Sequence, residues 1–265
     1  MAQTEQLSPD HPGPGHLSPD QIADFKRDGF VIARSLFDGA EMREIAAWTE
    51  DMQNRPEAPS KYMKYFEDSA LEPGSRILNR LENFEPYHPD FSRIIAGDRL
   101  LGSVGQLLGE PAVLYKDKIN FKLPGGGGFE PHQDQQAGWG VYADFFITAM
   151  VSVDAATAEN GCLEFAAGHH DRGLIGEEWM PLSDRQIAGM AFRPYPTKPG
   201  DVVLFDSFTP HGSAPNRSDR PRRILYLTYN RASAGDHRAQ YYADKRRSYP
   251  PDIEREPDKE YRYRV

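Results

Sequence analysis

The hydrophobic pattern of the chain changes near residue 110. Before this point, apolar residues recur mainly at the spacing of amphipathic helices, whereas after it they form short runs separated by glycine and proline. The change predicts that helices dominate the first part of the fold and strands dominate the second.

The first part is predicted to contain three helices. Ser18, Pro19 and Gln21 have the order of an N-cap, a first helical residue and the far end of a capping box, and this helix ends at Gly29. A second helix begins at Asp38 and continues to about Asn54, and a third covers residues 90–108. A short strand is predicted at 30–34, and two more within 61–84 flank a turn at 72–75.

Six strands are predicted in the second part, at residues 112–122, 129–134, 145–154, 162–166, 202–206 and 222–229. Many short strands with glycine and proline turns are typical of a sandwich or barrel. Together with the preceding helices, they predict a mainly β fold with flanking α-helices. The expected architecture is a double-stranded β-helix (a cupin-like jelly roll) buttressed by the N-terminal helices.

A length of 265 residues fits one large domain, which we expect to span residues 17–265. Residues 1–16 contain three prolines and two glycines and are expected to form a flexible tail. The segment 236–265 is rich in tyrosine, arginine and acidic residues, and we expect it to pack back on the barrel.

Composition excludes several classes of partner. The net charge of −9 argues against a nucleic-acid surface, which needs basic patches. No apolar run approaches the roughly 18–20 residues that span a bilayer, and the N-terminus lacks the basic and apolar regions of a secretory signal. Cys162 has no second cysteine with which to form an internal disulfide, so a cytoplasmic location is expected.

Three residues have the chemistry of a metal site. On a strand, side chains two residues apart share a face, so His132 and Asp134 are expected to point the same way. His211, arriving from another strand, would complete a set of two histidines and one carboxylate. This set binds non-heme Fe(II) and leaves three metal positions open. The alternative is that each is an ordinary polar residue of a strand.

An arginine pair follows His211. Arg222 lies 11 residues after it and begins a predicted strand. A co-substrate that chelates iron through a 2-oxo acid needs a cation for its far carboxylate, and the guanidinium can bind a carboxylate with two hydrogen bonds. Arg223 is expected on the opposite face of the strand and at the surface.

These motifs occur in an ordered set. It runs from Phe25-Lys26-Arg27-Asp28-Gly29-Phe30 through Glu130-Pro131-His132-Gln133-Asp134 and Asn160-Gly161-Cys162-Leu163-Glu164 to His211-Gly212-Ser213. The chain thereby resembles the phytanoyl-CoA dioxygenase-like (PhyH) branch of the Fe(II)/2-oxoglutarate dioxygenases.

The resemblance implies specific roles. His132, Asp134 and His211 would be the catalytic iron ligands, and Arg222 would bind 2-oxoglutarate. Asn120 and Ser213 are similar to positions that assist the co-substrate in some members. The implied reaction uses O₂, converts 2-oxoglutarate to succinate and CO₂, and hydroxylates a C–H bond. A carboxylate at Asp134 argues against halogenation, since the family's halogenases have Gly or Ala there.

Substrate residues are predicted from strand parity. Lys116 and Lys118 share a face with Asn120, and if that face is inward they would suit a small anionic substrate. Trp139, Arg80 and Asn83 could add contacts. For each charged residue the alternative is a solvent-exposed position, and Trp139 could simply pack. The segments 116–122 and 241–246 are similar to PhyH members that act on small zwitterions, including aminoalkylphosphonates and natural-product intermediates.

Two other classes of function remain open. One is a metal-dependent cupin-like hydrolase or isomerase, against which Arg222 at the family's offset from His211 and the PhyH-like helices argue. The other is a non-catalytic binding protein of the same fold, against which the complete ligand set argues.

Overall fold

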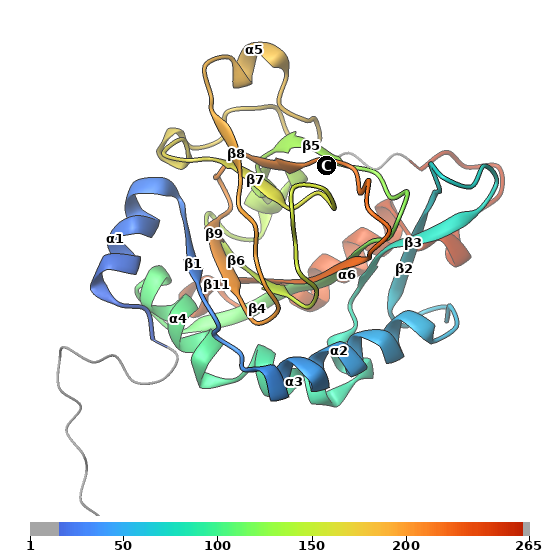
Figure 1. Cartoon of the computed structure of the whole chain (residues 1–265), viewed down its shortest axis with the longest axis horizontal. Coiled ribbons are helices and arrows are strands. Elements are labelled where there is room, and N and C mark those ends of the chain that lie inside the picture. The colour runs from blue at the N-terminus through green and yellow to red at the C-terminus, as the bar shows by residue number, and fades with distance from the viewer. Residues whose placement is uncertain (1–15, 262–265) are drawn as a thin grey trace, which may run out of the picture.

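Two antiparallel sheets form the centre of the protein (Figure 1). The computed structural model describes residues 16–261. The larger sheet has the order β1 (Phe30–Ala33), β9 (Val202–Asp206), β6 (Phe146–Ser152), β11 (Arg222–Arg231), β4 (Ala112–Lys122), β3 (Arg76–Glu82) and β2 (Met63–Asp68). The smaller sheet has the order β5 (Phe129–His132), β10 (His211–Ser213), β7 (Leu163–Ala166) and β8 (Phe192–Pro194). The two sheets agree with the predicted jelly roll.

Helices cover the outer face of the larger sheet. They are α1 (Pro19–Asp28), α2 (Gly39–Asn54), α3 (Ser92–Ile95) and α4 (Asp98–Leu108), while α5 (Asp184–Ile187) lies at the periphery and α6 (Arg238–Ser248) contacts β4 (Figure 1). None of the helices in residues 16–261 is long and apolar enough to cross a membrane.

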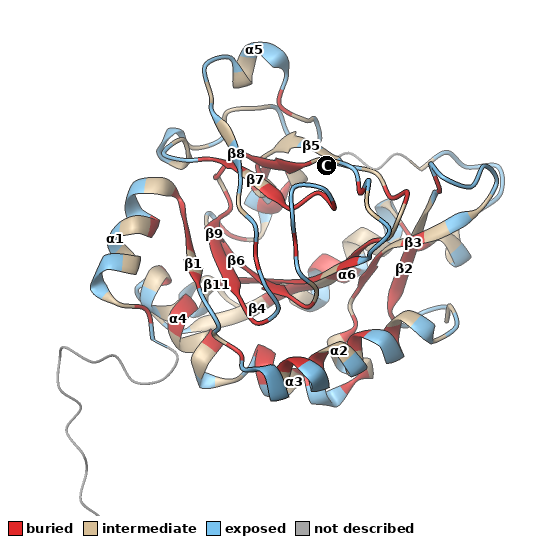
Figure 2. Cartoon of the chain, in the orientation of Figure 1, coloured by how far each residue is buried: buried red, intermediate tan, exposed pale blue. Residues whose placement is uncertain are grey.

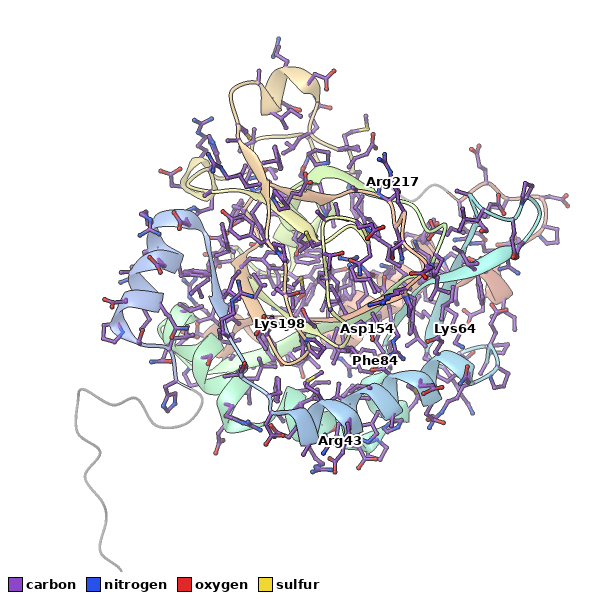
Figure 3. All side chains as sticks on the ribbon, viewed as in Figure 1. Arg43, Lys64, Phe84, Asp154, Lys198 and Arg217 are labelled. Carbon is purple, nitrogen blue, oxygen red and sulfur yellow. The ribbon has the colours of Figure 1, made fainter. Side chains whose placement is uncertain are left out.

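The larger sheet separates two apolar cores, and Figure 2 shows most of its residues buried. The outer core joins the sheet to the helices and includes Ile45 of α2, Leu100 of α4 and Phe84, whereas Arg43 projects from α2 into solvent (Figure 3). The inner core lies between the sheets, where Phe30 stacks on Phe165 at 4.5 Å between ring centroids. Burial of the apolar side chains on both faces of the larger sheet contributes most of the favourable free energy of folding.

The pairing of β4 with β11 decides which side chains face inward. Arg222 lies opposite Lys122, and Tyr226 lies opposite Lys118. Side chains alternate along a strand. In this part of β4 and β11, residues with odd numbers, such as Leu225, therefore pack in the outer core. Residues with even numbers, such as Ile224, face the space between the sheets.

Both predicted helix starts are confirmed. Ser18 and Asp38 are N-caps with complete capping boxes, and α1 ends at Gly29, whose φ of 84° lies in the left-handed region. The single helix predicted at 90–108 is wrong. A 3-10 turn at Pro89–Phe91 is followed by α3, and the chain then extends at Gly97 before α4. A Cβ on Gly97 would lie 2.5 Å from the carbonyl oxygen of Arg93, so the break requires glycine.

The strand predicted at 129–134 ends early, at His132, and a 3-10 helix (η3, Asp134–Ala137) begins at Asp134. Strands predicted at 145–154 and 162–166 are each trimmed to β6 and β7. Neither β8 nor the helical form of α6 was anticipated, because both lack clear periodicity in the sequence. Of the predicted N-terminal tail, residues 1–15 lie outside the described residues.

The capping box of α1 is expected to stabilise the protein measurably. Ser18→Ala removes the side-chain acceptor for the backbone N–H of Gln21. We expect the free energy of unfolding to fall by about 1 kcal/mol, as for other Ser caps. Urea unfolding measures the change, with Lys26→Ala, an exposed position in the same helix, as the control. An equal effect of the two substitutions would contradict the capping role.

Candidate metal centre and active-site cavity

The two histidines of the predicted metal site come from neighbouring strands. His132 is the last residue of β5, and His211 is the first residue of β10 and lies directly opposite it. Their ring centroids are 4.3 Å apart. Asp134 is not on the strand as the parity argument assumed, but begins η3 immediately after it. The turn nevertheless brings its carboxylate to the histidines.

The three side chains form a compact donor set. One nitrogen or oxygen of each lies within 4.8 Å of the others, and His211 Nε2 is 4.0 Å from Asp134 Oδ1. This set of two imidazoles and one carboxylate, with no fourth protein ligand among the described residues, fits a metal ion that keeps open positions.

Backbone carbonyls orient both imidazoles. His132 Nδ1 lies 2.7 Å from the carbonyl oxygen of Glu130, and His211 Nδ1 lies 2.9 Å from that of Thr209. A carbonyl oxygen only accepts hydrogen bonds, so each Nδ1 carries a proton and each Nε2 keeps its lone pair. Outer partners of this kind are typical of metal-binding histidines.

Burial keeps the imidazoles neutral. Burial and the neighbouring His211 lower the pKa of His132 to about 3, and burial lowers the pKa of His211 below its usual value. Burial alone would raise the pKa of Asp134, but His211 and Lys118 outweigh it and lower that pKa. Neutral imidazoles beside an ionised carboxylate are the protonation states that bind a cation.

A pair of threonines supports Asp134 from behind. The hydroxyl of Thr148 on β6 donates to Asp134 Oδ2 at 3.1 Å and lies 3.0 Å from the hydroxyl of Thr228 on β11. Both threonines are buried. The larger sheet therefore fixes one carboxylate oxygen, and Asp134 Oδ1 faces His211.

Arg222 is an uncompensated cation in the interior. Its side chain is fully buried, yet none of its three guanidinium nitrogens has a hydrogen-bonding partner of normal geometry within residues 16–261. Burial raises the pKa of the neighbouring Tyr226 hydroxyl, and Arg222 opposes this effect. An unpaired buried charge is costly, so the geometry fits an anionic group that arrives with a bound molecule. The carboxylate of a 2-oxo acid would satisfy this requirement.

Lys122 stands beside Arg222 and was missed in the sequence. Its ammonium group donates to Ser213 Oγ and to the carbonyl oxygen of Ala214, both at 2.6 Å. Burial and Arg222 lower its pKa to about 6. The predicted co-substrate residue Ser213 is therefore engaged by a lysine. Asn120, the other predicted co-substrate residue, is buried and lines the cavity, and its Oδ1 has no partner among the described residues.

A cavity of about 800 Å³ opens onto the three metal-site residues. Its wall combines aromatic and charged side chains from both sheets and from the loop that follows β7. The lining includes Tyr65, Glu67, Asn79, Arg80, Lys116, Lys118, Asn120, Glu130, His132, Asp134, Trp139, Trp179, Met180, His211, Tyr226 and Tyr249. Arg80, Lys116, Lys118 and Trp139, all predicted as substrate residues, thus border the same space as the metal-site residues.

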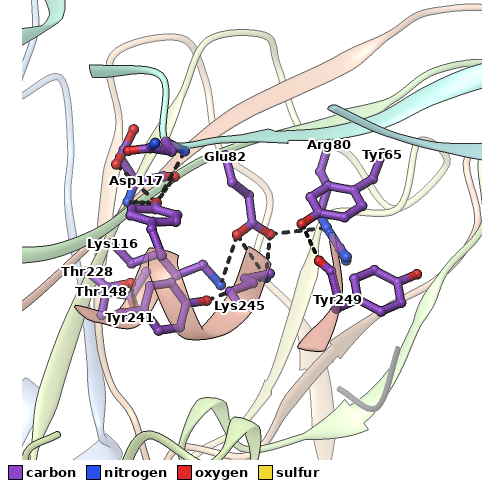
Figure 4. A network of polar contacts seen from close by, with 12 residues as sticks. Tyr65, Arg80, Glu82, Lys116, Asp117, Thr148, Thr228, Tyr241, Lys245 and Tyr249 are labelled. Carbon is purple, nitrogen blue, oxygen red and sulfur yellow. Dashed lines mark hydrogen bonds and ion pairs between the residues drawn. The ribbon is translucent and has the colours of Figure 1, made fainter. Parts of the chain in front are cut away.

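The cationic wall is organised by one buried carboxylate, Glu82 (Figure 4). Lys245 of α6 lies 2.9 Å and 2.8 Å from its two oxygens, and Arg80 Nε lies 3.1 Å from Oε1. Lys116 Nζ approaches to 3.9 Å. Burial would raise the pKa of Glu82, but these cations outweigh it and lower the pKa, so the carboxylate is ionised. Cations from β3, β4 and α6 therefore surround this carboxylate.

Lys118 lowers the pKa of Asp134 more than Lys116 does. Burial, reinforced by Lys116, lowers the pKa of Lys118 itself to about 7, whereas Asp134 and Glu82 act in the opposite direction. Its Nζ lies 4.6 Å from the ring centroid of Tyr226. Lys116 Nζ is likewise 5.4 Å from the ring of Trp139. Aromatic faces stabilise these ammonium groups where hydration is reduced.

Trp139 combines the two roles considered for it. It is buried against Tyr115 and Phe146 and also lines the cavity. Asn83 is placed differently from expectation: it is not among the residues that line the cavity, and its side chain accepts a hydrogen bond from Arg238 at 3.3 Å. Asn83 follows the end of β3 with a φ of 55°, so the strand parity used to predict its direction no longer applies.

Arg223 lies on the opposite face from Arg222, as predicted, but it is not a free surface residue. It forms hydrogen bonds of 2.8 Å and 2.9 Å to the two oxygens of Asp154. Figure 3 labels this aspartate.

The sequence contained a signal for some of the missed residues. Lys122 continues the even-numbered series of Lys116 and Lys118, and Glu82 shares a strand face with Arg80, so parity would have found both. Lys245, Tyr249 and Trp179 come from segments whose position depends on long-range packing. No spacing rule in the sequence points to them.

Comparisons with known proteins agree with this arrangement. The family model described as phytanoyl-CoA dioxygenase (PhyH) matches residues 25–224. The chain is 42% identical over 247 residues to a 2-aminoethylphosphonate dioxygenase from uncultured bacterium HF130_AEPn_1, covering 93% of this chain and 94% of the relative. It is 39% identical over 234 residues to a methylphosphonate hydroxylase from Gimesia maris, covering 88% of each.

The fold also has a solved counterpart. The crystal structure of EctD from S. alaskensis with 2-oxoglutarate and 5-hydroxyectoine matches with a TM-score of 0.70 and 24% identity, covering 86% of this chain and 83% of that one. At this identity the likeness concerns the fold, and it agrees with the jelly roll described above. With the family model spanning most of the chain and two relatives aligned over nearly their whole length, the protein belongs to the phytanoyl-CoA dioxygenase (PhyH) family.

Proposed function

We propose that this protein is an Fe(II)- and 2-oxoglutarate-dependent dioxygenase that hydroxylates a small organophosphonate. The leading candidate is an aminoalkylphosphonate. The observation that carries the proposal is the shared cavity, in which the set His132, Asp134 and His211 faces the cationic side chains of Arg80, Lys116 and Lys118. When bound, iron would supply the chemistry that couples O₂ reduction to decarboxylation of 2-oxoglutarate and oxidation of the substrate.

The chain's own residues would each have a defined task. His132, Asp134 and His211 would hold the iron, and Arg222 would bind the far carboxylate of 2-oxoglutarate. The dry surroundings of Arg222 support this role, because a buried guanidinium and a carboxylate form a strong charge-assisted pair. Asn120, with its unpaired Oδ1, would face the same region.

The charge of the wall supports an anionic substrate. Arg80, Lys116 and Lys118 line the cavity with the metal-site residues, whereas their neighbour Glu82 does not line it. A phosphonate or carboxylate would stabilise these positive charges in a partly desolvated cavity. Two relatives are named for phosphonates, which supports phosphonate over other anions.

Two carboxylates favour a zwitterion over a simple anion. Glu67 of β2 and Glu130 of β5 also line the cavity. One oxygen of Glu67 accepts the backbone N–H of Gly127, and Oε1 has no partner within the described residues. A substrate with an ammonium group at one end and a phosphonate at the other would match both signs of charge.

The family name does not imply an acyl-CoA substrate here. A cavity of about 800 Å³ falls within the range of small-molecule sites, and cations dominate its wall near the metal-site residues. A long acyl chain would bury these charges against hydrocarbon, which is unfavourable. The buried free thiol of Cys162 agrees with the reducing cytoplasm that we propose as the protein's location.

The other two classes of function, a cupin-like hydrolase or isomerase and a non-catalytic binding protein, explain fewer of the residues in the site. A cupin-like hydrolase or isomerase would leave Arg222 buried without a partner, and a binding protein would have no use for three oriented metal ligands. Succinate formation from 2-oxoglutarate with added Fe(II) separates both from a dioxygenase.

The metal-site assignment predicts a common outcome for three variants. His132→Ala, Asp134→Ala and His211→Ala should each lose bound iron and succinate formation, while the fold persists because none of the three belongs to the two apolar cores. Iron analysis, circular dichroism and a succinate assay measure these effects. His237→Ala, at a half-buried histidine outside the cavity, should retain both properties. Full iron content and activity in any of the three variants would refute the assignment.

The two adjacent arginines provide a matched pair. Arg222→Lys keeps the charge but loses the two-pronged hydrogen bond. We expect the KM for 2-oxoglutarate to rise roughly tenfold or more, which corresponds to losing about 1.5–3 kcal/mol from a charge-assisted hydrogen bond. Arg223→Lys, which affects the pair with Asp154 on the other face, should leave this KM nearly unchanged. Similar KM changes at both positions would rule out the proposed co-substrate site.

The substrate proposal predicts which compounds are turned over. Succinate release above the uncoupled background should be strong with 2-aminoethylphosphonate, weaker with methylphosphonate and absent with acyl-CoA thioesters. Coupled turnover of an acyl-CoA without turnover of small anions would overturn the proposal.

Lys118→Ala should raise the KM for the phosphonate about tenfold or more, since a charge-assisted contact is lost, but should change the KM for 2-oxoglutarate little. Lys198→Ala, at an exposed lysine outside the cavity, is the control. If the Lys118 substitution raises both KM values equally, this lysine belongs to the co-substrate site.

A further inference from the structure

Trp179 has a backbone conformation that is rare for a bulky residue. It lies in the loop between β7 and α5, and its φ of 64° is in the left-handed region. Such conformations cost of order 1–3 kcal/mol and persist only where the surroundings impose them. The loop therefore holds this side chain in a defined place.

The surroundings that impose it belong to the metal-binding segment. The backbone N–H of Trp179 donates to the carbonyl oxygen of Gln136 at 2.7 Å. The buried side chain of Gln136 in turn donates to the carbonyl oxygens of Glu177 and Met180, at 2.8 Å and 2.5 Å. Gln136 lies in η3, the short helix that begins at Asp134. The position of Trp179 is thus tied to that of a metal-site residue.

The indole ring rests on a glycine of the same segment. A Cβ on Gly138 would lie only 2.3 Å from Cζ2 of Trp179. Gly138 also has a positive φ of 71°, so the position favours glycine on two grounds. The ring occupies the space that a side chain at Gly138 would otherwise fill.

This ring stands where two cavities meet. Beside the metal-site cavity lies a second cavity of about 720 Å³, and both are lined by Lys116, Ala137, Trp179 and Tyr249. The second cavity is otherwise lined by residues such as Val141, Tyr142, Tyr241, Asp244 and Tyr261. Trp179 is 44% exposed. A smaller side chain at this position would therefore widen the connection between the two cavities without removing a buried core residue.

From this position we propose that Trp179 is a specificity-determining residue that sets the maximum length of the substrate. The ring closes the metal-site cavity toward the second cavity, and a short phosphonate fits on the near side. A longer aminoalkylphosphonate would have to extend past Lys116 into the second cavity. The inference rests on the proposed function, since it concerns which phosphonates the same site accepts.

The second cavity has the chemistry to receive such a tail. Three tyrosines line it (Tyr142, Tyr241 and Tyr261), together with the carboxylates of Glu178 and Asp244 and the cations Lys245 and Lys259. Asp244 is paired with Arg247, so the carboxylate of Glu178, next to Trp179 in the chain, is the one that would favour an ammonium group at the end of an alkyl chain, beside the aromatic faces. The residue that blocks the passage thus separates the metal from a surface suited to a longer zwitterion.

The experiment compares two substrates of different length. For wild-type protein and Trp179→Ala, kcat/KM is measured with 2-aminoethylphosphonate and with 5-aminopentylphosphonate, using coupled succinate release. We expect the ratio of the two values to shift toward the longer substrate by about tenfold or more, the scale on which a pocket discriminates chain length. Trp179→Phe, which keeps a smaller ring, should give an intermediate shift and serves if the alanine variant is unstable.

Two control variants separate opening of the wall from general disturbance of the surface. Leu174→Ala changes a residue in the same loop that is 41% exposed and lines neither cavity. Ile253→Ala changes a residue that is 45% exposed and lines neither cavity. Neither should alter the ratio for the two substrates.

The possible failures are distinguishable. Wild-type protein that is inactive on both phosphonates while forming succinate with another substrate overturns the proposed substrate class and, with it, the length limit. Wild-type protein that is active on 2-aminoethylphosphonate, with an unchanged ratio in both Trp179 variants, overturns the length limit alone. An equal shift in Leu174→Ala also overturns it.

Discussion

The antiparallel pairing of β4 with β11 is the constraint on which the site depends. It places Lys116, Lys118, Asn120 and Lys122 on the same face as Arg222 and Tyr226, between the two sheets. A slip of β4 by one residue would move its lysines into the outer apolar core, where these cations would have no partner. The outer core therefore protects the register, since Ile119 and Leu225 must remain packed against the helices.

Concentrating cations in the interior has a cost, and the structure offsets it locally. Glu82 neutralises part of the charge of Arg80, Lys116 and Lys245, and aromatic rings cover the ammonium groups of Lys116 and Lys118. Arg222 is the exception, because its guanidinium nitrogens have no hydrogen-bonding partner of normal geometry among the described residues. Separating the partners of a buried charge pair is strongly destabilising. The charged side chains of the cavity wall are therefore held in place together. Such a fixed wall presents its charge to a ligand without rearrangement, which favours binding.

The sequence predicted the parts of the site that depend on local rules. Strand parity grouped Lys116 and Lys118 with Asn120 on one face and separated Arg222 from Arg223, and capping residues located the starts of α1 and α2. It was wrong where the chain leaves regular structure, as at Asp134, which begins a 3-10 helix, and at Asn83, which turns away from the cavity. Lys245 and Trp179 could not be predicted, since α6 and the loop before α5 reach the site only through tertiary packing.

The proposed function requires that the metal and the anion bind in one cavity. The most direct measurement is the ³¹P relaxation rate of 2-aminoethylphosphonate with the anaerobic protein, Fe(II) and 2-oxoglutarate, because a paramagnetic ion accelerates relaxation only of nuclei close to it. We expect strong enhancement with wild-type protein and little with His211→Ala, which would not bind the metal, or with Lys118→Ala, which would bind the phosphonate weakly. A phosphonate that binds to the iron-loaded protein without enhanced relaxation would place the anion elsewhere and contradict the account.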